Sequence, residues 1–240
     1  PVVERAPDRP LRIFAFWKHY NWENHNLLPA LAKFGEVVHY DPTEDFDPAA
    51  PGEPDREGRA RMQERLRTLI IEAHARAPLD LLFFYASGAS LDPPFLGRLA
   101  ALGIPMVNFG HDDIVYFEDR KVDGIYRGNA HIASCFDVYC CTSAIGFQKA
   151  LAVGATPYFM PGGGNPEVYR PRPGMQRDLD VVLVGARFYD RGETIEHLRG
   201  RGIEVQAFGR GWPSGPVSND EQIELLSRAR IVLGFNRCSG

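Results

Sequence analysis

The sequence predicts an α/β protein with two parallel-sheet domains in tandem. Apolar, strand-like runs alternate with helix-like segments along the chain, which is typical of parallel sheets joined by right-handed crossovers. A Gly- and Pro-rich segment, residues 161–174, interrupts this alternation once. We therefore expect a Rossmann-like N-terminal domain over residues 1–165, and over residues 175–240 the start of a second one.

The helices and strands of the first domain are predicted from the spacing of apolar residues and from the Pro, Gly and Asp residues that start or end helices. In residues 55–77, apolar side chains recur with a helical period, and Pro78 ends the helix. Asp92 is a good N-cap, Pro93 suits the first helical position, and Gly103 follows the last turn. With the helices 23–34 and 144–153, these segments separate strands expected at residues 11–17, 36–40, 80–85, 104–109, 136–141 and 157–160.

The second domain repeats the pattern, with helices at 193–201 and 220–229 between strands at 180–184, 203–208 and 230–235. The run from Ile231 to Phe235 is apolar throughout, so we expect a strand buried on both faces. No helix follows it, and Pro1 stands in place of an initiator Met. We therefore expect the sequence to be part of a longer protein whose second domain is cut short.

Composition and charge argue against a membrane-spanning protein and against one that binds nucleic acid or a membrane surface. Of the 240 residues, 44% are hydrophobic and 24% charged, as in ordinary globular proteins, and no apolar run is long enough to span a membrane. The net charge of −4 disfavours binding to nucleic acid or a membrane surface. Residues 170–240 nevertheless carry 11 Arg against 9 acidic residues, which suits a phosphate-bearing ligand. The four Cys lack metal-ligand spacing, so we expect reduced thiols and a cytoplasmic protein.

In open parallel sheets, ligands bind at the carboxyl ends of the strands, so the loops after strands are the candidate sites. The loop after the first strand carries His19, Trp22 and Glu23, side chains that suit recognition of a polar ring, although the Trp side chains can equally pack the loop. Ser87 follows the third strand in a small-residue turn that lets a ligand approach the backbone or simply joins strand to helix. We assign all four residues to acceptor binding.

His111, Asp112 and Asp113 follow the fourth strand and form the sharpest cluster of titratable groups in the first domain. A carboxylate that orients His111 would make it a general base near neutral pH. A divalent metal on the two aspartates is a rival role, and capping of the next helix is a purely structural one. We take the three residues as candidate catalytic groups and expect no metal.

Two loops of the second domain are candidate anion sites. The first, Gly185 to Arg191, precedes a helix whose N-terminal N–H groups attract anions, and Arg187 and Arg191 can add bidentate contacts to phosphate oxygens. The second places Gly209, Arg210 and Trp212 together, as one wall of a nucleobase pocket or as a plain surface turn. Neither loop contains the glycine fingerprint of dinucleotide binding or the phosphate-binding P-loop motif.

The order of these motifs resembles the CgeB-like, spore-maturation-type glycosyltransferases. Residues 180–212 match the family's strand ending in Gly, its Arg-initiated helix, and its second strand ending in Gly shortly before Trp. The stretches IPMVNFGHDD, FDVYCCTS and GATPYFMPGGGNPEVYRP match the family's acidic pair and its run into the interdomain linker. The resemblance covers the chain from about residue 80 onward.

This resemblance implies the two-domain GT-B architecture, in which a nucleotide-sugar donor binds the C-terminal domain and a hydroxyl acceptor faces the N-terminal one. It implies reaction in the cleft without an essential metal or a further cofactor. Gly185, Arg187 and Arg191 would lie near the donor diphosphate, the segment from Gly209 to Trp212 near the nucleoside, and the two aspartates would face the cleft. The family's ribose-binding acidic residues, its last strands and its returning helix would lie beyond residue 240, so this stretch alone is expected to lack turnover.

The leading hypothesis is therefore a glycosyltransferase. A non-catalytic, two-lobed sugar-binding protein is an alternative, although such proteins usually carry export signals and cross their hinge more than once. A metal-dependent hydrolase built on residues 111–113 is a further alternative, which requires additional ligands such as His19 and His25.

Overall fold

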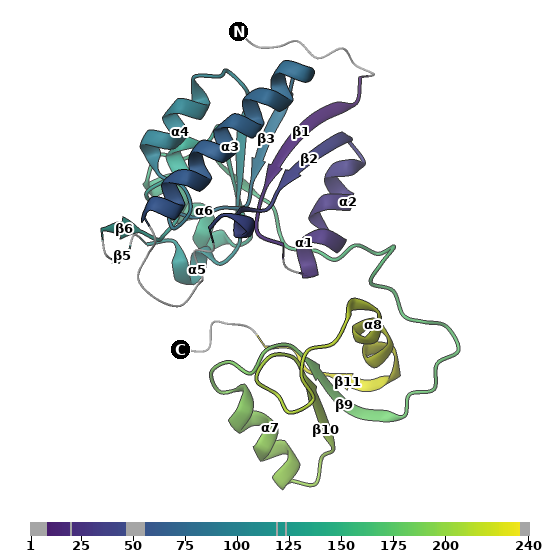
Figure 1. The fold of residues 1–240 in the computed structure, drawn as a ribbon. Helices are drawn as coiled ribbons and strands as arrows, with labels where there is room; N and C mark the ends of the chain where they lie inside the picture. The colour runs from purple at the N-terminus through teal and green to yellow at the C-terminus, as the bar shows by residue number, and fades with distance from the viewer. Residues whose placement is uncertain (1–8, 20, 47–55, 119, 123, 236–240) are drawn as a thin grey trace. The chain divides into compact units, whose positions relative to one another are not determined.

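A computed structural model describes residues 9–19, 21–46, 56–118, 120–122 and 124–235 (Figure 1). The chain divides into two compact units between Gly163 and Gly164. Each unit has its own parallel sheet, which confirms the predicted fold class of two Rossmann-like α/β units in tandem.

Unit 1 is built on a six-stranded sheet in the order β2-β1-β3-β4-β7-β8, and every neighbouring pair is parallel. The order explains why β1 is so apolar: it lies inside the sheet, where helices cover both faces. Four successive residues of this strand, from Ile13 to Phe16, are buried. The strands are β1 (Leu11–Phe16), β2 (Gly35–Tyr40), β3 (Leu81–Phe84), β4 (Met106–Gly110), β7 (Val138–Cys141) and β8 (Pro157–Phe159).

Six helices, two 3-10 turns and a small antiparallel hairpin connect these strands. Asp92 caps α4 as predicted, because its carboxylate accepts a hydrogen bond from the Phe95 backbone N–H. The helices are α1 (Asn21–His25), α2 (Leu27–Ala32), α3 (Arg56–Arg76), α4 (Pro93–Ala100), α5 (Asp113–Tyr116) and α6 (Ala144–Ala152). The turns are η1 (Pro42–Glu44) and η2 (Ala133–Cys135), and the hairpin is β5 (Lys121–Val122) with β6 (Ile125–Tyr126).

One predicted helix of unit 1 is two helices in the structure. The sequence predicts a continuous helix over residues 23–34, but α1 ends at His25 and α2 begins at Leu27. Pro29 accounts for the break, since it has no N–H to donate to the carbonyl of His25 and is tolerated only in a first turn.

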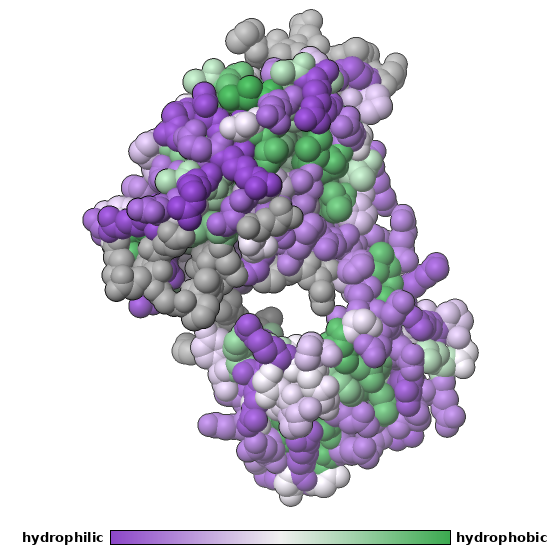
Figure 2. Space-filling model, in the orientation of Figure 1, coloured by the Kyte–Doolittle hydropathy of each residue, from purple (hydrophilic) through white to green (hydrophobic). Residues whose placement is uncertain are grey.

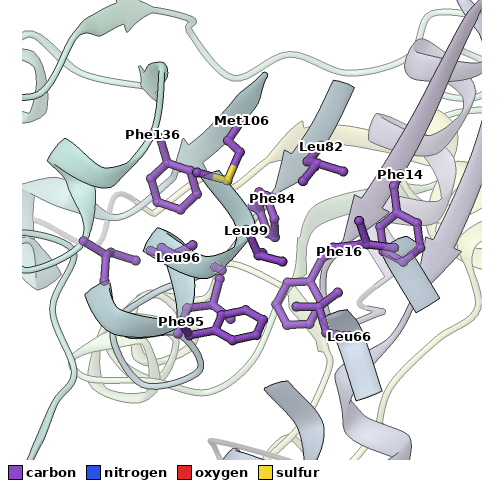
Figure 3. Close-up of a cluster of buried hydrophobic side chains, with 14 of the residues drawn as sticks. Phe14, Phe16, Leu66, Leu82, Phe84, Phe95, Leu96, Leu99, Met106 and Phe136 are labelled. Atoms are coloured by element: carbon purple, nitrogen blue, oxygen red, sulfur yellow. The ribbon is translucent and has the colours of Figure 1, made fainter. Parts of the chain in front are cut away.

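The main core of unit 1 lies between one face of the sheet and helices α3, α4 and α6 (Figures 1 and 3). Phe14, Phe16, Leu82 and Phe84 of the sheet meet Leu66 of α3 there, and α4 adds three more apolar side chains. Burying one such side chain contributes about 2 kcal/mol. A smaller cluster on the opposite face packs against α2.

Unit 2 has a three-stranded parallel sheet in the order β10-β9-β11. Its helix α8 begins with a full capping box, because Ser218 and Glu221 each bond the other's backbone N–H. The elements are β9 (Leu179–Val184), α7 (Arg191–Gly200), β10 (Val205–Phe208), α8 (Asn219–Arg228) and β11 (Ala229–Val232).

The prediction of a buried last strand is wrong. β11 starts and ends earlier than expected, and only Ala229 of its residues is buried, while Ile231 and Val232 are 57% and 51% exposed. The strand pairs with β9 alone among the described residues, so it stands at an edge of the sheet, where apolar sequence does not guarantee cover. Figure 2 shows apolar patches among the mainly polar surface of the chain.

Three of the four cysteines lie in the described part and are free thiols, as expected. Burial raises the pKa of the Cys140 thiol to about 11 and that of Cys141 to about 12, so both are protonated near neutral pH. Cys238 lies outside the described residues. No helix in the described ranges is both long and apolar enough to cross a bilayer.

Candidate functional site

The strand order of unit 1 places a crevice where the connections change direction. From β1 the chain moves outward to β2, and then returns to continue through β3 and β4 on the other side. Where neighbouring loops diverge in this way, the carboxyl ends of the strands leave an opening that binds ligands in open α/β sheets.

A cavity of about 350 Å³ lies at this place. The residues that follow β1, β3 and β4 form its walls, together with part of the loop after the β5–β6 hairpin. Its lining residues are Phe16, Lys18, Pro42, Tyr85, Ala86, Ser87, Ser90, Phe109, His111, Asp112, Tyr116, Arg127 and Asn129. We call this cavity the unit 1 pocket.

His111 and Asp112 form a paired imidazole and carboxylate in the wall of the pocket. The distance from His111 Nδ1 to Asp112 Oδ1 is 3.3 Å. The hydrogen bond to Asp112 raises the pKa of His111 above its ordinary value, against the opposing effect of burial, and the charges of Glu23 and Asp113 add to the rise. With Nδ1 engaged by the carboxylate, Nε2 is the atom that can take a proton.

Asp113 does not face the pocket, although the sequence analysis placed it with the two preceding residues. Its side chain is buried, with the residue only 1% exposed. Its carboxylate accepts hydrogen bonds from Asn129 Nδ2 at 2.7 Å and from the Tyr139 hydroxyl at 3.0 Å. The side chain turns inward because Asp113 is the first residue of α5, while His111 and Asp112 precede that helix.

The surroundings of Asp113 tie four segments together. Lys149 of α6 donates to the Asp113 carbonyl at 3.3 Å, and a Cβ on Gly146 would lie 2.9 Å from the Asp113 Cβ. Burial raises the pKa of Asp113, and the same burial together with the Asp113 charge raises that of Tyr139. We infer that Asp113 anchors the loop that carries the His111–Asp112 pair.

The predicted acceptor residues are distributed differently. Ser87 lines the pocket, while Glu23 is buried and acts on it through its charge on His111. The His19 ring lies against that of His39, with centroids 4.2 Å apart and planes tilted by 46°, and the His19 backbone N–H donates to Asp41. The Trp22 side chain lies outside the described part of the structure.

Six lining residues carry polar groups that were not predicted as site residues: Lys18, Tyr85, Ser90, Tyr116, Arg127 and Asn129. The last two belong to a segment without regular period, and only Gly128 between them signals a tight approach. Their place in the pocket depends on how the hairpin folds back, which short-range pattern does not encode.

In unit 2, the loops after β9 and β10 touch through their glycines. Gly209 has a φ of +129°, and a Cβ there would lie 2.5 Å from the Gly185 carbonyl oxygen. Trp212 donates its indole N–H to that same oxygen at 2.8 Å. Trp212 is therefore a packing residue of the loop pair, only 7% exposed.

The structure brings the predicted arginines to this edge of the unit 2 sheet. Arg187 pairs with Glu196 at 3.0 Å and lies over the Trp212 ring, and Arg191 donates to the Ala186 carbonyl at 2.9 Å. The guanidinium of Arg210 lies 5.2 Å from the ring centroid of Phe188. The three side chains are gathered around one loop, partly through contacts within the protein.

This loop also has an aromatic feature that was not predicted from the sequence. Tyr189 is the one non-glycine residue with positive φ in the described part of the chain, at 51°, and it is 70% exposed. A left-handed conformation costs a residue with a side chain about 1 kcal/mol, and such strain concentrates at functional sites. Phe188 beside it is exposed too.

Among the described residues, no three His, Cys, Asp or Glu side chains are arranged to hold a metal ion. Ligands beyond residues 111–113, which the hydrolase hypothesis requires, are thus not found in that part of the chain.

The chain is similar to known proteins only in structure, and only at low sequence identity. No protein-family description and no curated protein matches the sequence. UDP-GlcNAc 2-epimerase from Methanocaldococcus jannaschii aligns with 94% of this chain and 74% of its own, at 8% identity and a TM-score of 0.48.

Two further solved structures align over a similar extent. Arabidopsis thaliana UGT89C1, complexed with UDP-L-rhamnose, aligns with 95% of this chain and 70% of its own, at 10% identity and a TM-score of 0.43. Acinetobacter baumannii MurG aligns with 95% and 67%, at 13% identity and a TM-score of 0.41. At these scores the likeness assigns neither family nor activity.

Proposed function

We propose that the chain belongs to a glycosyltransferase that moves a sugar from a nucleoside-diphosphate sugar to a hydroxyl acceptor. The observation that carries the proposal is the His111–Asp112 pair in the wall of a cavity at the switch point of the unit 1 sheet. A hydroxyl bound there meets a base whose ring a carboxylate orients.

The proposed reaction begins with proton transfer. His111 Nε2 takes the proton of the acceptor hydroxyl while Nδ1 donates to Asp112, whose charge stabilises the imidazolium that forms. The acceptor oxygen forms a bond to the anomeric carbon of the sugar, and the bond from that carbon to the diphosphate oxygen breaks. The nucleoside diphosphate leaves with the bonding electron pair.

We assign the donor diphosphate to the loop pair of unit 2. Helix α7 begins at Arg191, at the end of the loop after β9, and the N-terminus of a helix attracts anions through its dipole and its first N–H groups. Arg187, Arg191 and Arg210 add positive charge where negative charge grows on the leaving group. With this charge supplied by the protein, we expect no requirement for a metal ion.

Calorimetry with UDP, GDP, ADP and TDP tests the donor assignment on the full chain. We expect one of them to bind, and Arg210→Ala to weaken binding about tenfold, the loss typical of one charge-assisted contact. Arg201→Ala is the matched control, because Arg201 is an exposed arginine just after α7 and is not part of the loop pair. No binding by any of the four nucleotides, or equal effects of both substitutions, would contradict the donor site.

A further inference from the structure

The loop after the β5–β6 hairpin contributes two residues to the unit 1 pocket, Arg127 and Asn129, and the Oδ1 atom of Asn129 is buried without a hydrogen-bond partner. We propose that this pocket selects an acceptor that carries an anionic group, a carboxylate or a phosphate, beside the hydroxyl, with Arg127 binding the anion and Asn129 accepting a hydrogen bond from the acceptor. That the bound molecule is the acceptor of a glycosyl transfer rests on the proposed function, whereas the binding of an anion in this pocket does not.

Arg127 is a half-buried arginine without an internal partner. It lines the pocket, and its guanidinium makes no ion pair, hydrogen bond or ring contact within the described structure. Other partly buried arginines of unit 1 have counterions: Arg12 pairs with Glu36, and Arg59 with Asp92. Partial burial of a guanidinium without a counterion is costly, so the side chain is suited to an anion from outside.

The side chain of Asn129 supplies a hydrogen-bond acceptor atom, Oδ1, that no group of the protein uses. The residue is only 8% exposed, and its amide Nδ2 donates to Asp113 at 2.7 Å. This bond fixes the amide orientation, since the carboxylate oxygen accepts there and the amide nitrogen is the donor. The Oδ1 atom is buried without a hydrogen-bond partner, although the residue lines the pocket. A hydroxyl or N–H group of a ligand would remove that deficit.

Backbone contacts hold the main chain of this loop in place. The Gly88 N–H donates to the Gly128 carbonyl at 3.1 Å, and the Ala130 N–H donates to Phe117 at 2.7 Å. A Cβ on Gly128 would collide with the Glu118 carbonyl, so the loop packs closely against that segment. The loop is therefore ordered before any ligand binds, which reduces the entropic cost of binding.

The charge of the lining residues agrees with an anionic ligand. Among the described residues that line the pocket, Lys18 and Arg127 are cationic and Asp112 is the one carboxylate, which is paired with His111. The aromatic side chains Phe16, Tyr85, Phe109 and Tyr116 form much of the remaining wall. A small anion with a neighbouring hydroxyl suits this combination of one cation, Arg127, and one oriented hydrogen-bond acceptor, Asn129 Oδ1.

The test measures binding of small probes to the full chain by calorimetry, without nucleotide. The probes are glycerol 3-phosphate, glycerate and neutral glycerol. We expect at least one of the two anions to bind about tenfold more tightly than glycerol, and the tighter one identifies the anion as phosphate or carboxylate. Arg127→Ala should remove this advantage, and Arg127→Lys should retain part of it.

The matched control is Arg120→Ala. Arg120 lies at the other end of the hairpin and is exposed, and it does not line the pocket. Asn129→Ala should weaken each anion by a smaller factor without removing its advantage over glycerol, and thermal melting checks that the variant folds.

Three results would overturn the proposal: equal binding of anions and glycerol, an anion advantage that survives Arg127→Ala, or an equal loss with Arg120→Ala. The donor test is separate. If no nucleoside diphosphate binds while an anion advantage depends on Arg127, the proposed glycosyl transfer fails and the anion site stands.

Discussion

Among single side chains, His111 makes the most direct prediction about pH. Asp112 raises its pKa, and in the proposed reaction the neutral form is the base, so the rate should fall as pH drops through that raised pKa. Asp112→Asn should move this acidic limb to lower pH and reduce the maximal rate. The profile of kcat/KM against pH, with the acceptor and donor identified by the binding tests, measures both changes.

The same pair makes a stability prediction of known sign. A raised folded-state pKa stabilises the protonated form, so the contribution is present below the unfolded pKa of about 6.5 and disappears as pH rises through the folded value. Asp112→Asn should thus destabilise the protein at pH 5 and leave it almost unchanged at pH 9. A larger loss at pH 9 than at pH 5 would contradict the pairing.

Asp113 should behave differently from its neighbour. Asp113→Ala leaves Asn129 Nδ2 and the Tyr139 hydroxyl without their acceptor in a buried site, and we expect a loss of about 3 kcal/mol in the free energy of unfolding. Urea denaturation measures it. Asp112→Ala is the control from the same loop, because that side chain is 40% exposed and should cost less than about 1 kcal/mol at neutral pH. Similar costs for the two variants would show that the buried network is not formed.

Among elements, the contact between the loops of unit 2 can be tested through its glycines. Gly209→Ala forces a left-handed residue against the Gly185 carbonyl, and we expect a loss of about 3 kcal/mol. Gly202 also has a positive φ, +78°, but open space around an added Cβ, so about 1 kcal/mol is expected for Gly202→Ala. Thermal unfolding compares the two variants, and equal losses would mean that the loops do not touch.

The exposed strand β11 gives the opposite kind of prediction. Ile231→Thr should change stability by less than about 0.5 kcal/mol, since the side chain is already in water. Val182→Ala in the neighbouring strand β9 should cost about 2 kcal/mol, because that side chain is fully buried. A large loss for Ile231→Thr in denaturant unfolding would indicate that another surface covers β11.

For the whole molecule, the features that sequence predicted are those fixed by neighbours in the chain. The Asp92-Pro93 helix start and the helical face of α3 rest on local contacts, and the structure has them. The exposure of Ile231 depends on which elements pack above it, so pattern alone gave the wrong answer there. The break before Pro29 has a local cause, the missing N–H of that proline, which the prediction of one continuous helix did not take into account.

Some residues of the candidate site could likewise be predicted from the sequence, and others could not. His111, Asp112 and Ser87 line the pocket because they follow strands. The rule that ligands bind at the carboxyl ends of parallel strands can be applied to the sequence alone, so these residues were predicted. Asp113 turns inward because a helix starts at that residue, and Arg127 and Asn129 reach the pocket only after a hairpin folds against Gly88. Contacts between residues so far apart in the sequence depend on tertiary packing, so the sequence pattern did not predict them.

The backbone bonds that anchor the loop around Gly128 have an evolutionary consequence. Since Gly88 and Phe117 hold its main chain, the guanidinium at position 127 contributes nothing to keeping the loop closed. We expect a single codon change there to alter which small anions bind the unit 1 pocket while the scaffold stays intact, so related chains should diverge at this position earlier than at Gly128.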